Sequence, residues 1–370
     1  MYSGLFDSKN QLLQPDRSRR RVIGGAFGWA AAGAAPAWAQ RATPPAAATP
    51  IWSAAPDLAA RYQRAFAGLD ARIRNQWTDV QSVALLHRGQ LAFEFYRSGL
   101  TTDTLQDTQS VTKSVLALLF GQAQADGHLR GPQELVALRL PQILRVGADA
   151  RVRQLRFAHL LTMTAGWPGD QTARRDRDDD LRQLVRRTFV AEPGQRFAYD
   201  NGAANLLALA LANAVDQPLA DYARQRLFTP LGIDRFEWRR GAQGYALGAM
   251  GLSLNTRGMA RIGELVLNEG RWQGHALVPT DHVRAATSRR NAGGLPLGNA
   301  YGYLWWVAPS GAGSRPVAMA NGYGGQWIYV DPARSLVAAV TARRTPESAA
   351  RGQALQLIRR ALLPAARQMG

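Results

Sequence analysis

Two side chains that could carry out nucleophilic chemistry lie three residues apart at the start of an apolar segment. The apolar run 115–120 predicts a buried helix, with Asp107 and Thr108 as its candidate caps. Ser110 would lie in the first turn of this helix, and Lys113 would lie over the same face. A neighbouring amine can activate a serine hydroxyl for attack on a carbonyl, so the pair predicts an acyl-transfer site.

The lysine of this pair stands out against the composition of the chain. Of the 45 basic residues, 43 are arginine and only Lys9 and Lys113 are lysine. Lysine can give up its proton and arginine cannot, which favours a functional amine at position 113. The alternative is a capped helix with a solvated lysine.

A second pair of polar side chains precedes another apolar segment. Tyr199 and Asn201 lie in the turn before a predicted helix from Ala203 to Ala214. A phenol can shuttle a proton and an amide can orient a neighbouring group, so both could face the same cleft as the serine. The alternative is a buried tyrosine with Asn201 as a helix cap.

Other polar residues do not predict a site. His159 heads an apolar run, where a structural hydrogen bond is favoured over catalysis. The run Asp178-Asp179-Asp180 has arginines on either side and predicts a solvated segment. With no cysteine and five scattered histidines, the sequence predicts neither a metal site nor a cofactor.

The remaining elements indicate an α+β fold with one sheet assembled from both ends of the chain. We expect an amphipathic helix over 58–77, a hairpin over 83–96 with its turn at Arg88-Gly89, and helices and loops over 215–300. An aromatic strand over 301–307, a glycine segment at 323–325 running into a strand, a partner strand over 335–341 and helices over 346–369 follow. The sheet part would comprise about 55–125 and 300–370, and the helical part about 126–299.

The first 39 residues predict an export signal. Arginines at 19–21 precede a weakly apolar stretch that ends Ala37-Trp38-Ala39, which is typical of a cleaved leader of the twin-arginine type. Residues 40–54 predict a linker, and 55–370 the mature domain. We therefore expect a periplasmic or secreted protein with no integral membrane span in the mature chain.

The net charge of +18 does not predict nucleic-acid binding. The leader carries five basic and two acidic side chains, so +15 would remain after its removal. No basic block with interleaved aromatic residues occurs in the mature chain, which instead predicts a generally basic surface.

Taken in order, Ser110-x-x-Lys113, Tyr199-x-Asn201 and Gly322-Tyr-Gly-Gly-Gln resemble the motifs of the serine β-lactamase and penicillin-binding protein superfamily. Within it the chain is most similar to class C β-lactamase-like esterases and amidases such as 6-aminohexanoate-dimer hydrolase. The likeness covers roughly residues 55–365 and includes His159-Leu-Leu-Thr-Met-Thr-Ala-Gly and Pro230-Leu-Gly-Ile.

The resemblance implies an antiparallel sheet flanked by N- and C-terminal helices, with an all-helical region beside it. It implies that Ser110 is acylated, that Lys113 and Tyr199 share the base and acid roles, and that Asn201 orients Lys113 and the substrate. The backbone amides of Ser110 and Gln326 would form the oxyanion hole. Tyr323, Gly324 and Gly325 would match the family's Lys-Thr-Gly substrate strand.

One departure from the family pattern concerns the substrate. Tyr323 replaces the lysine or histidine, and Gly324 the hydroxyl residue, of members that recognise lactams, which argues against efficient β-lactam hydrolysis. We expect a small ester, amide or peptide-like substrate. The alternatives are a β-lactamase or D-alanyl peptide hydrolase, a catalytically silent binding protein on the same fold, and a basic envelope-binding module. Oligomeric state is not predicted.

Overall fold

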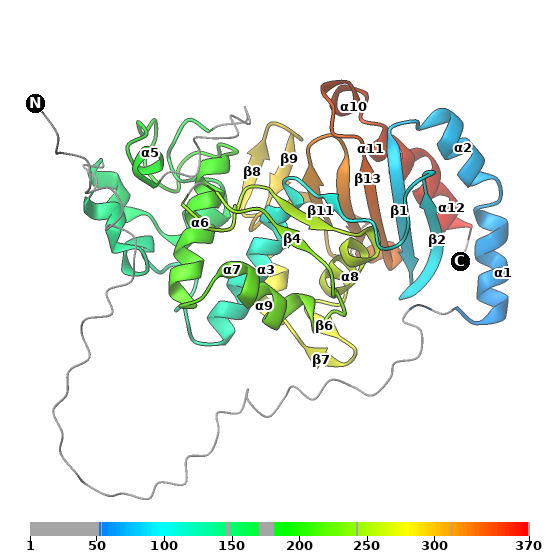
Figure 1. Cartoon of the computed structure of the whole chain (residues 1–370), viewed down its shortest axis with the longest axis horizontal. Helices are drawn as coiled ribbons and strands as arrows, with labels where there is room; N and C mark the ends of the chain where they lie inside the picture. The colour runs from blue at the N-terminus through cyan, green and yellow to red at the C-terminus, as the bar shows by residue number, and fades with distance from the viewer. Residues whose placement is uncertain are drawn as a thin grey trace, which may run out of the picture. The chain divides into compact units, whose positions relative to one another are not determined.

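The computed structural model describes Trp52 and residues 54–145, 149–169, 181–241, 243–311 and 313–368. Its central element is an antiparallel sheet in the order β2-β1-β13-β12-β11-β10-β9-β8 (Figure 1). The strands are β1 (Val80–His87), β2 (Gln90–Tyr96), β8 (Asn291–Gly294), β9 (Asn299–Tyr301), β10 (Trp306–Ala308), β11 (Val317–Gly322), β12 (Gln326–Asp331) and β13 (Leu336–Ala342).

The two ends of the chain meet in the middle of this sheet. Strand β1 pairs with β13, with Val83 opposite Val340, and β1 and β2 form the predicted hairpin. Its turn residues Arg88 and Gly89 both have positive φ, 53° and 73°, as a tight two-residue turn requires. The predicted α+β class, with one sheet built from both chain ends, is confirmed.

Helices cover both faces of the sheet, and others form a separate group beside it (Figure 1). Helix α8 packs against β1, β12 and β13, and a Cβ on its Gly263 would lie 2.4 Å from a methyl carbon of Val337. The helices are α1 (Pro56–Ala65), α2 (Leu69–Gln76), α3 (Val111–Ala125), α4 (Phe157–Leu161), α5 (Leu181–Val185), α6 (Asn201–Ala214), α7 (Leu219–Ala223), α8 (Thr256–Leu267), α9 (Thr280–Ala286), α10 (Pro346–Arg351), α11 (Gln353–Leu357) and α12 (Leu363–Arg367).

Helix α3 lies between the sheet and the helical group. It contacts β11 and β12 on one side and α6 and α9 on the other, and residues 111–123 are all buried. An apolar segment of this length with no polar face is stable only where it is covered on every side. The sequence therefore places the first turn of α3 at the junction of the two parts.

Three predicted elements differ from the structure. The helix expected over 58–77 is broken into α1 and α2, because Gly68 adopts a left-handed φ of 69°. The region expected to be helical up to 299 contributes strand β8 and the start of strand β9 to the sheet. The aromatic strand expected over 301–307 is interrupted at Leu304, whose φ is 56° and whose amide donates to the Leu161 carbonyl.

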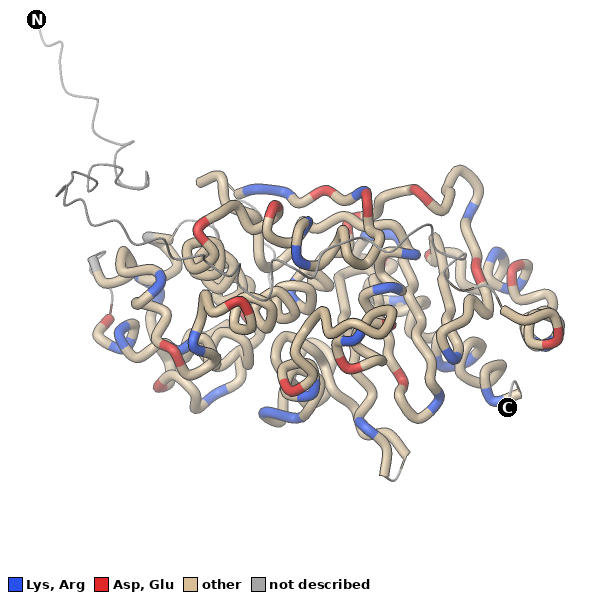
Figure 2. Tube along the Cα trace, turned by 90° about the horizontal axis from the view of Figure 1, so that it is seen from below, with Lys and Arg blue, Asp and Glu red and all other residues tan. Residues whose placement is uncertain are grey.

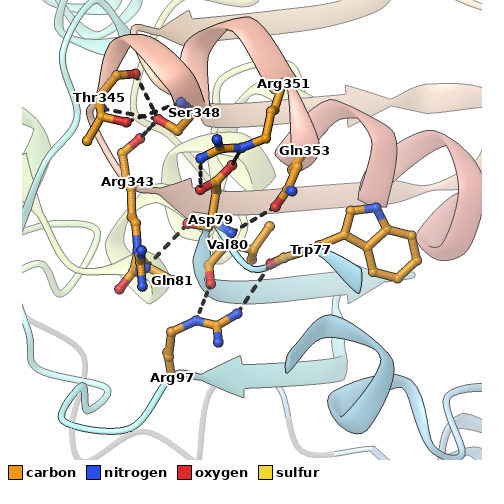
Figure 3. A network of polar contacts seen from close by, with 10 residues as sticks. All are labelled: Trp77, Asp79, Val80, Gln81, Arg97, Arg343, Thr345, Ser348, Arg351 and Gln353. Carbon is orange, nitrogen blue, oxygen red and sulfur yellow. Dashed lines mark hydrogen bonds and ion pairs between the residues drawn. The ribbon is translucent and has the colours of Figure 1, made fainter. Parts of the chain in front are cut away.

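A network of polar contacts ties β1 to the C-terminal helices (Figure 3). The buried carboxylate of Asp79 accepts two hydrogen bonds of 2.6 Å from Arg351, and its amide donates to Gln353. On the other side, the Arg97 guanidinium donates to the carbonyls of Val80 and Trp77. The contacts of Asp79 with Arg351 and Gln353 link residues more than 250 positions apart in the sequence.

Basic and acidic residues are interspersed along the whole described chain rather than gathered in one block (Figure 2). None of the helices in the described ranges is long and apolar enough to cross a membrane. Two further elements stand apart from the main sheet: a small sheet of β3 (Gln106–Asp107), β5 (Leu252–Leu254) and β4 (Glu237–Trp238), and a hairpin of β6 (Arg271–Trp272) and β7 (His275–Ala276). The predicted leader, most of the linker and the Asp178–Asp180 run lie outside the described residues.

Candidate active site

Ser110 occupies the residue before the first turn of α3. It is the N-cap of the helix, and its side chain makes no capping bond. The predicted caps are wrong: the Asp107 carboxylate accepts the amide of Gln109, and the Thr108 hydroxyl donates to the Leu252 carbonyl at 2.8 Å. Within the described ranges, the backbone N–H of Ser110 donates to no acceptor. Both the hydroxyl and the amide of Ser110 therefore remain available for chemistry.

Lys113 is fully buried beside this serine. Its Nζ lies 2.8 Å from Ser110 Oγ, 2.8 Å from Asn201 Oδ1 and 2.7 Å from the Ala249 carbonyl oxygen. Burial lowers the pKa of the amine to about 7, and the nearby Asp200 carboxylate opposes this shift only in part. An amine held in this way can exchange a proton with Ser110 near neutral pH.

Helix α6 delivers the second pair of side chains. Its N-cap is Asp200, not Asn201: the Asp200 carboxylate accepts the Gly202 amide at 2.9 Å and two bonds from Arg187. Asn201 is thereby the first residue of the helix, and its side chain is free to face Lys113. Because Asp200 takes over the capping, both flanking residues, Tyr199 and Asn201, contact the serine and lysine pair.

Tyr199 completes the cluster. Its hydroxyl lies close enough to the Ser110 side chain to interact with it, and the Lys113 Nζ lies 5.0 Å from its ring centroid. Burial raises the pKa of the phenol to about 12, with the Ser110 hydrogen bond opposing the shift. Its ring stacks on Trp306, with centroids 5.7 Å apart and planes 17° apart, and meets Tyr301 edge-on. This packing fixes the ring and keeps the phenol neutral.

The Ala249 carbonyl oxygen, the third acceptor for the Lys113 amine, could not be predicted from the sequence. The Ala249 amide donates to Asn205 Oδ1 at 2.9 Å, which holds this loop against α6. Gly248 allows the approach, since a Cβ there would lie 2.1 Å from the Ala204 carbonyl oxygen. A main-chain carbonyl is present at every position, so only the tertiary structure identifies this one.

The glycine segment expected to be a substrate strand is a turn. Tyr323, Gly324 and Gly325 connect β11 to β12, with φ values of 82° and 110° at the two glycines. A Cβ on Gly324 would lie 2.5 Å from the Arg343 carbonyl oxygen. The glycines therefore serve the turn and its packing against Arg343.

The unpaired edge of the sheet lies on β11 instead. Strand β10 pairs only with residues 317–319 of β11, so Ala320, Asn321 and Gly322 have no strand partner on that side within the described chain. A Cβ on Gly322 would lie 2.2 Å from the Thr108 carbonyl oxygen, which places the end of β11 against the turn that carries Ser110. This edge borders the cluster.

Gln326, predicted as the second oxyanion donor, is the first residue of β12 and is buried. It pairs with Gly322 across the hairpin, and its side chain donates to the Ala342 carbonyl at 2.7 Å. Strand β12 has a neighbour on each side, whereas β11 is open at this end. Gln326 thus supports the hairpin from within the sheet.

His159 does not join the cluster through any hydrogen bond described in the structure. Its Nδ1 accepts the Arg156 amide at 3.2 Å and so helps to begin helix α4. The described residues contain no group of three or more histidine and acidic side chains that could hold a metal ion. The cluster around Ser110 itself brings together a hydroxyl, an amine and a phenol.

Comparisons with known proteins agree with this fold. The family model described as Beta-lactamase matches residues 63–363. A Bacillus anthracis protein provisionally described as a 6-aminohexanoate-dimer hydrolase is 17% identical, with a TM-score of 0.67, covering 81% of this chain and 82% of its own. EstCE1, a hydrolase with promiscuous acyltransferase activity, is 17% identical, with a TM-score of 0.65 and coverage of 82% and 98%.

A penicillin-binding protein homologue from Caulobacter crescentus is 16% identical, with a TM-score of 0.61, covering 83% of this chain and 99% of its own. No curated protein matches the sequence. At these identities the solved structures establish the fold, and the chemistry of the site has to be argued from its own residues.

Proposed function

Because this chain belongs to the beta-lactamase family, we propose that it is a serine hydrolase that cleaves an ester or amide bond through an acyl-enzyme on Ser110. The observation that carries the proposal is the position of the Ser110 hydroxyl, 2.8 Å from a buried amine and beside the buried Tyr199 phenol. The distance to the amine is within the reach that proton transfer requires.

The pKa values favour different roles for the Lys113 amine and the Tyr199 phenol. Lys113, with its pKa lowered to about 7, takes the proton from Ser110 as the Oγ–carbon bond forms. Tyr199, neutral because its pKa is raised to about 12, donates its proton to the leaving group and recovers one from Lys113. Water then attacks the acyl-enzyme, with the same groups returning the protons, and releases the acid.

The oxyanion that forms in each step needs two donors. The Ser110 amide, with no acceptor in the described structure, is the first. The sheet register favours Asn321 over Gln326 as the second. The Gly322 carbonyl accepts the Gly325 amide within the hairpin, and main-chain groups alternate in direction along a strand, so the Asn321 amide points to the open edge.

Covalent labelling tests the proposal directly. We expect a fluorophosphonate probe to add one adduct, located at Ser110 by peptide mapping, and Ser110→Ala to abolish it. Lys113→Arg should also abolish labelling, because a guanidinium cannot accept the proton. Wild-type protein that stays unmodified while folded would instead indicate a silent binding protein.

A β-lactamase or D-alanyl peptide hydrolase remains the second candidate. Arg344 lies beside Gly324, where it could contact a substrate carboxylate, but its guanidinium is paired with Asp107 at 2.8 Å. A nitrophenyl ester and nitrocefin assayed in parallel separate the two activities. We expect the ester to be the better substrate, and faster turnover of nitrocefin would favour the second candidate.

A further inference from the structure

The residue before the nucleophile has an unfavourable backbone conformation. Gln109 has a φ of +53°, in the left-handed region that residues with a side chain rarely adopt. Its torsions set the direction of the peptide that carries the Ser110 amide. A conformation of this kind persists only where neighbouring groups hold it.

The Asp107 carboxylate makes the contacts that hold Gln109. Its Oδ1 accepts the Gln109 amide at 2.9 Å, and its Oδ2 accepts the Gln109 side-chain amide at 2.8 Å. The same Oδ2 accepts the Arg344 guanidinium at 2.8 Å. One carboxylate thus fixes both the main chain and the side chain of Gln109, and it is itself fixed by an arginine that follows β13.

Two other contacts accompany this arrangement without replacing it. The Thr112 hydroxyl donates to the Gln109 carbonyl at 2.7 Å, and a Cβ on Gly322 would lie 3.0 Å from the Gln109 Cβ. The Thr112 hydroxyl holds only the Gln109 carbonyl, and Gly322 only restricts the room around the Gln109 side chain. Neither contact provides an acceptor for the Gln109 amide. Loss of Asp107 would therefore leave that amide free to turn.

We propose that Asp107 is a positioning residue of the active site. It holds Gln109 in the left-handed conformation and so directs the Ser110 amide toward the oxyanion and the Ser110 hydroxyl toward Lys113. This inference rests on the proposed function, since it assumes that Ser110 is the acylated residue. The role of Asp107 is conformational, and it takes no part in proton transfer.

A rescue experiment tests this role. The readout is the second-order rate constant for fluorophosphonate labelling at Ser110, with the melting temperature measured for each variant. We expect Asp107→Ala to slow labelling at least tenfold. Asp107→Asn should stay within about threefold of wild type, because its side-chain oxygen can still accept the Gln109 amide.

Glycine at position 109 supplies the decisive comparison. Glycine adopts a positive φ without steric cost, so Gln109→Gly should raise the labelling rate of Asp107→Ala at least fivefold. In the wild-type background the same change should slow labelling slightly, since a glycine is held less firmly. A purely structural contribution of Asp107 to the ion pair with Arg344 would not be rescued by a change at 109.

Matched controls lie elsewhere in the chain. Asp103→Ala changes an exposed aspartate near the same turn, and Gln273→Gly changes an exposed residue with a φ of +47° in the β6–β7 turn. Both should label at the wild-type rate. If Asp107→Ala does not fold, Asp107→Ser with and without Gln109→Gly provides the same comparison, because serine accepts the amide more weakly.

The outcomes separate the two proposals. Wild-type protein that is not labelled at Ser110 overturns the proposed function and this inference together. Wild-type protein that is labelled, with Asp107→Ala labelled at the same rate or not rescued by Gln109→Gly, overturns the inference alone.

Discussion

Among single residues, Lys113 is the one whose chemistry depends most on its surroundings. Three oxygen atoms surround its amine, and burial lowers its pKa to about 7. An ammonium ion donates to all three oxygens, whereas the neutral amine has two protons and a lone pair that can accept from Ser110. In the proposed mechanism, the protonation state of Lys113 therefore decides whether the serine is activated.

Activity should follow this ionisation. In the proposed mechanism the neutral amine is the base, so we expect kcat/KM for a nitrophenyl ester to rise with pH through about 7 and then level off. The measurement is a rate profile from pH 5 to 9. A rate that still increases about tenfold per pH unit between pH 8 and 9 would show that burial does not lower the pKa of the base.

The same shift has a consequence for stability. Because the Lys113 pKa is lower in the folded state than in the unfolded chain, the unfolded chain binds more protons between about pH 7 and the ordinary lysine pKa, and stability rises with pH there. Lys113→Met lacks this group. We expect the free energy of unfolding of wild type, minus that of Lys113→Met, to increase from pH 7 to 10 in urea titrations, whereas a constant difference would contradict the shift.

Tyr199 offers a variant that removes chemistry and keeps packing. Tyr199→Phe retains the stack on Trp306 but loses the hydroxyl, so kcat/KM should fall about 10²- to 10⁴-fold with a small change in melting temperature. Tyr329→Phe is a matched control, since both tyrosines are 9% exposed. A Tyr199→Phe enzyme with wild-type activity would rule out the phenol as the acid.

The sequence was enough to predict the four polar side chains of the cluster, because few reactions use residues of these types in this arrangement. A lone lysine near a serine, and a tyrosine near an asparagine before a helix, narrow the possible chemistry. It could not identify Ala249, which acts through a carbonyl, or Trp306, which packs against Tyr199 from a distant strand. It also left open a helix cap at Asn201, because an aspartate and an asparagine in adjacent positions cap equally well, and the structure places the cap at Asp200.

At the scale of elements, the end of β11 is the part that sequence reasoning misplaced. Glycines at 324 and 325 are compatible either with a strand edge that a substrate could approach or with a turn. The pairing of Gly322 with Gln326 shows that they lie in a turn. The buried helices α3 and α6 were predictable because long apolar runs leave few choices. The break between β9 and β10 was not, because it depends on the contact between Leu304 and Leu161.

The contact between β11 and the nucleophile turn can be tested by adding one methyl group. Gly322→Ala would place a Cβ 2.2 Å from the Thr108 carbonyl oxygen, so we expect a loss of about 1–3 kcal/mol in stability and slower labelling of Ser110. Gly311→Ala, where a Cβ meets nothing within 4 Å, is the control. Equal melting temperatures for the two variants would show that β11 does not press on the turn.

At the scale of the whole molecule, the buried Asp79 carboxylate joins the first strand to the C-terminal helices (Figure 3). Its side chain is 2% exposed, whereas that of Arg351 is 48% exposed. Removing the arginine leaves a buried charge without its partner, and removing the carboxylate leaves an arginine that water can reach. The two halves of this pair are therefore unequal in their effect on stability.

This asymmetry gives a prediction. We expect Arg351→Met to lower the free energy of unfolding by more than Asp79→Asn does, because only the first change leaves the buried carboxylate unpaired. Urea unfolding of both variants measures the difference. Arg360→Met, which changes an exposed arginine of the same C-terminal region, should lie within about 0.5 kcal/mol of wild type. Equal losses for Asp79→Asn and Arg351→Met would show that the buried charge is not the cause.

The pairing of β1 with β13 has a consequence for how the protein is made. The first strand finds its central neighbour only after nearly all of the remaining chain has been synthesised, since Val83 lies opposite Val340. Closing a loop of this length is slow, so the β1–β13 pairing forms late in folding. Until then β1 has β2 alone beside it, and its other edge is open to pairing with other molecules.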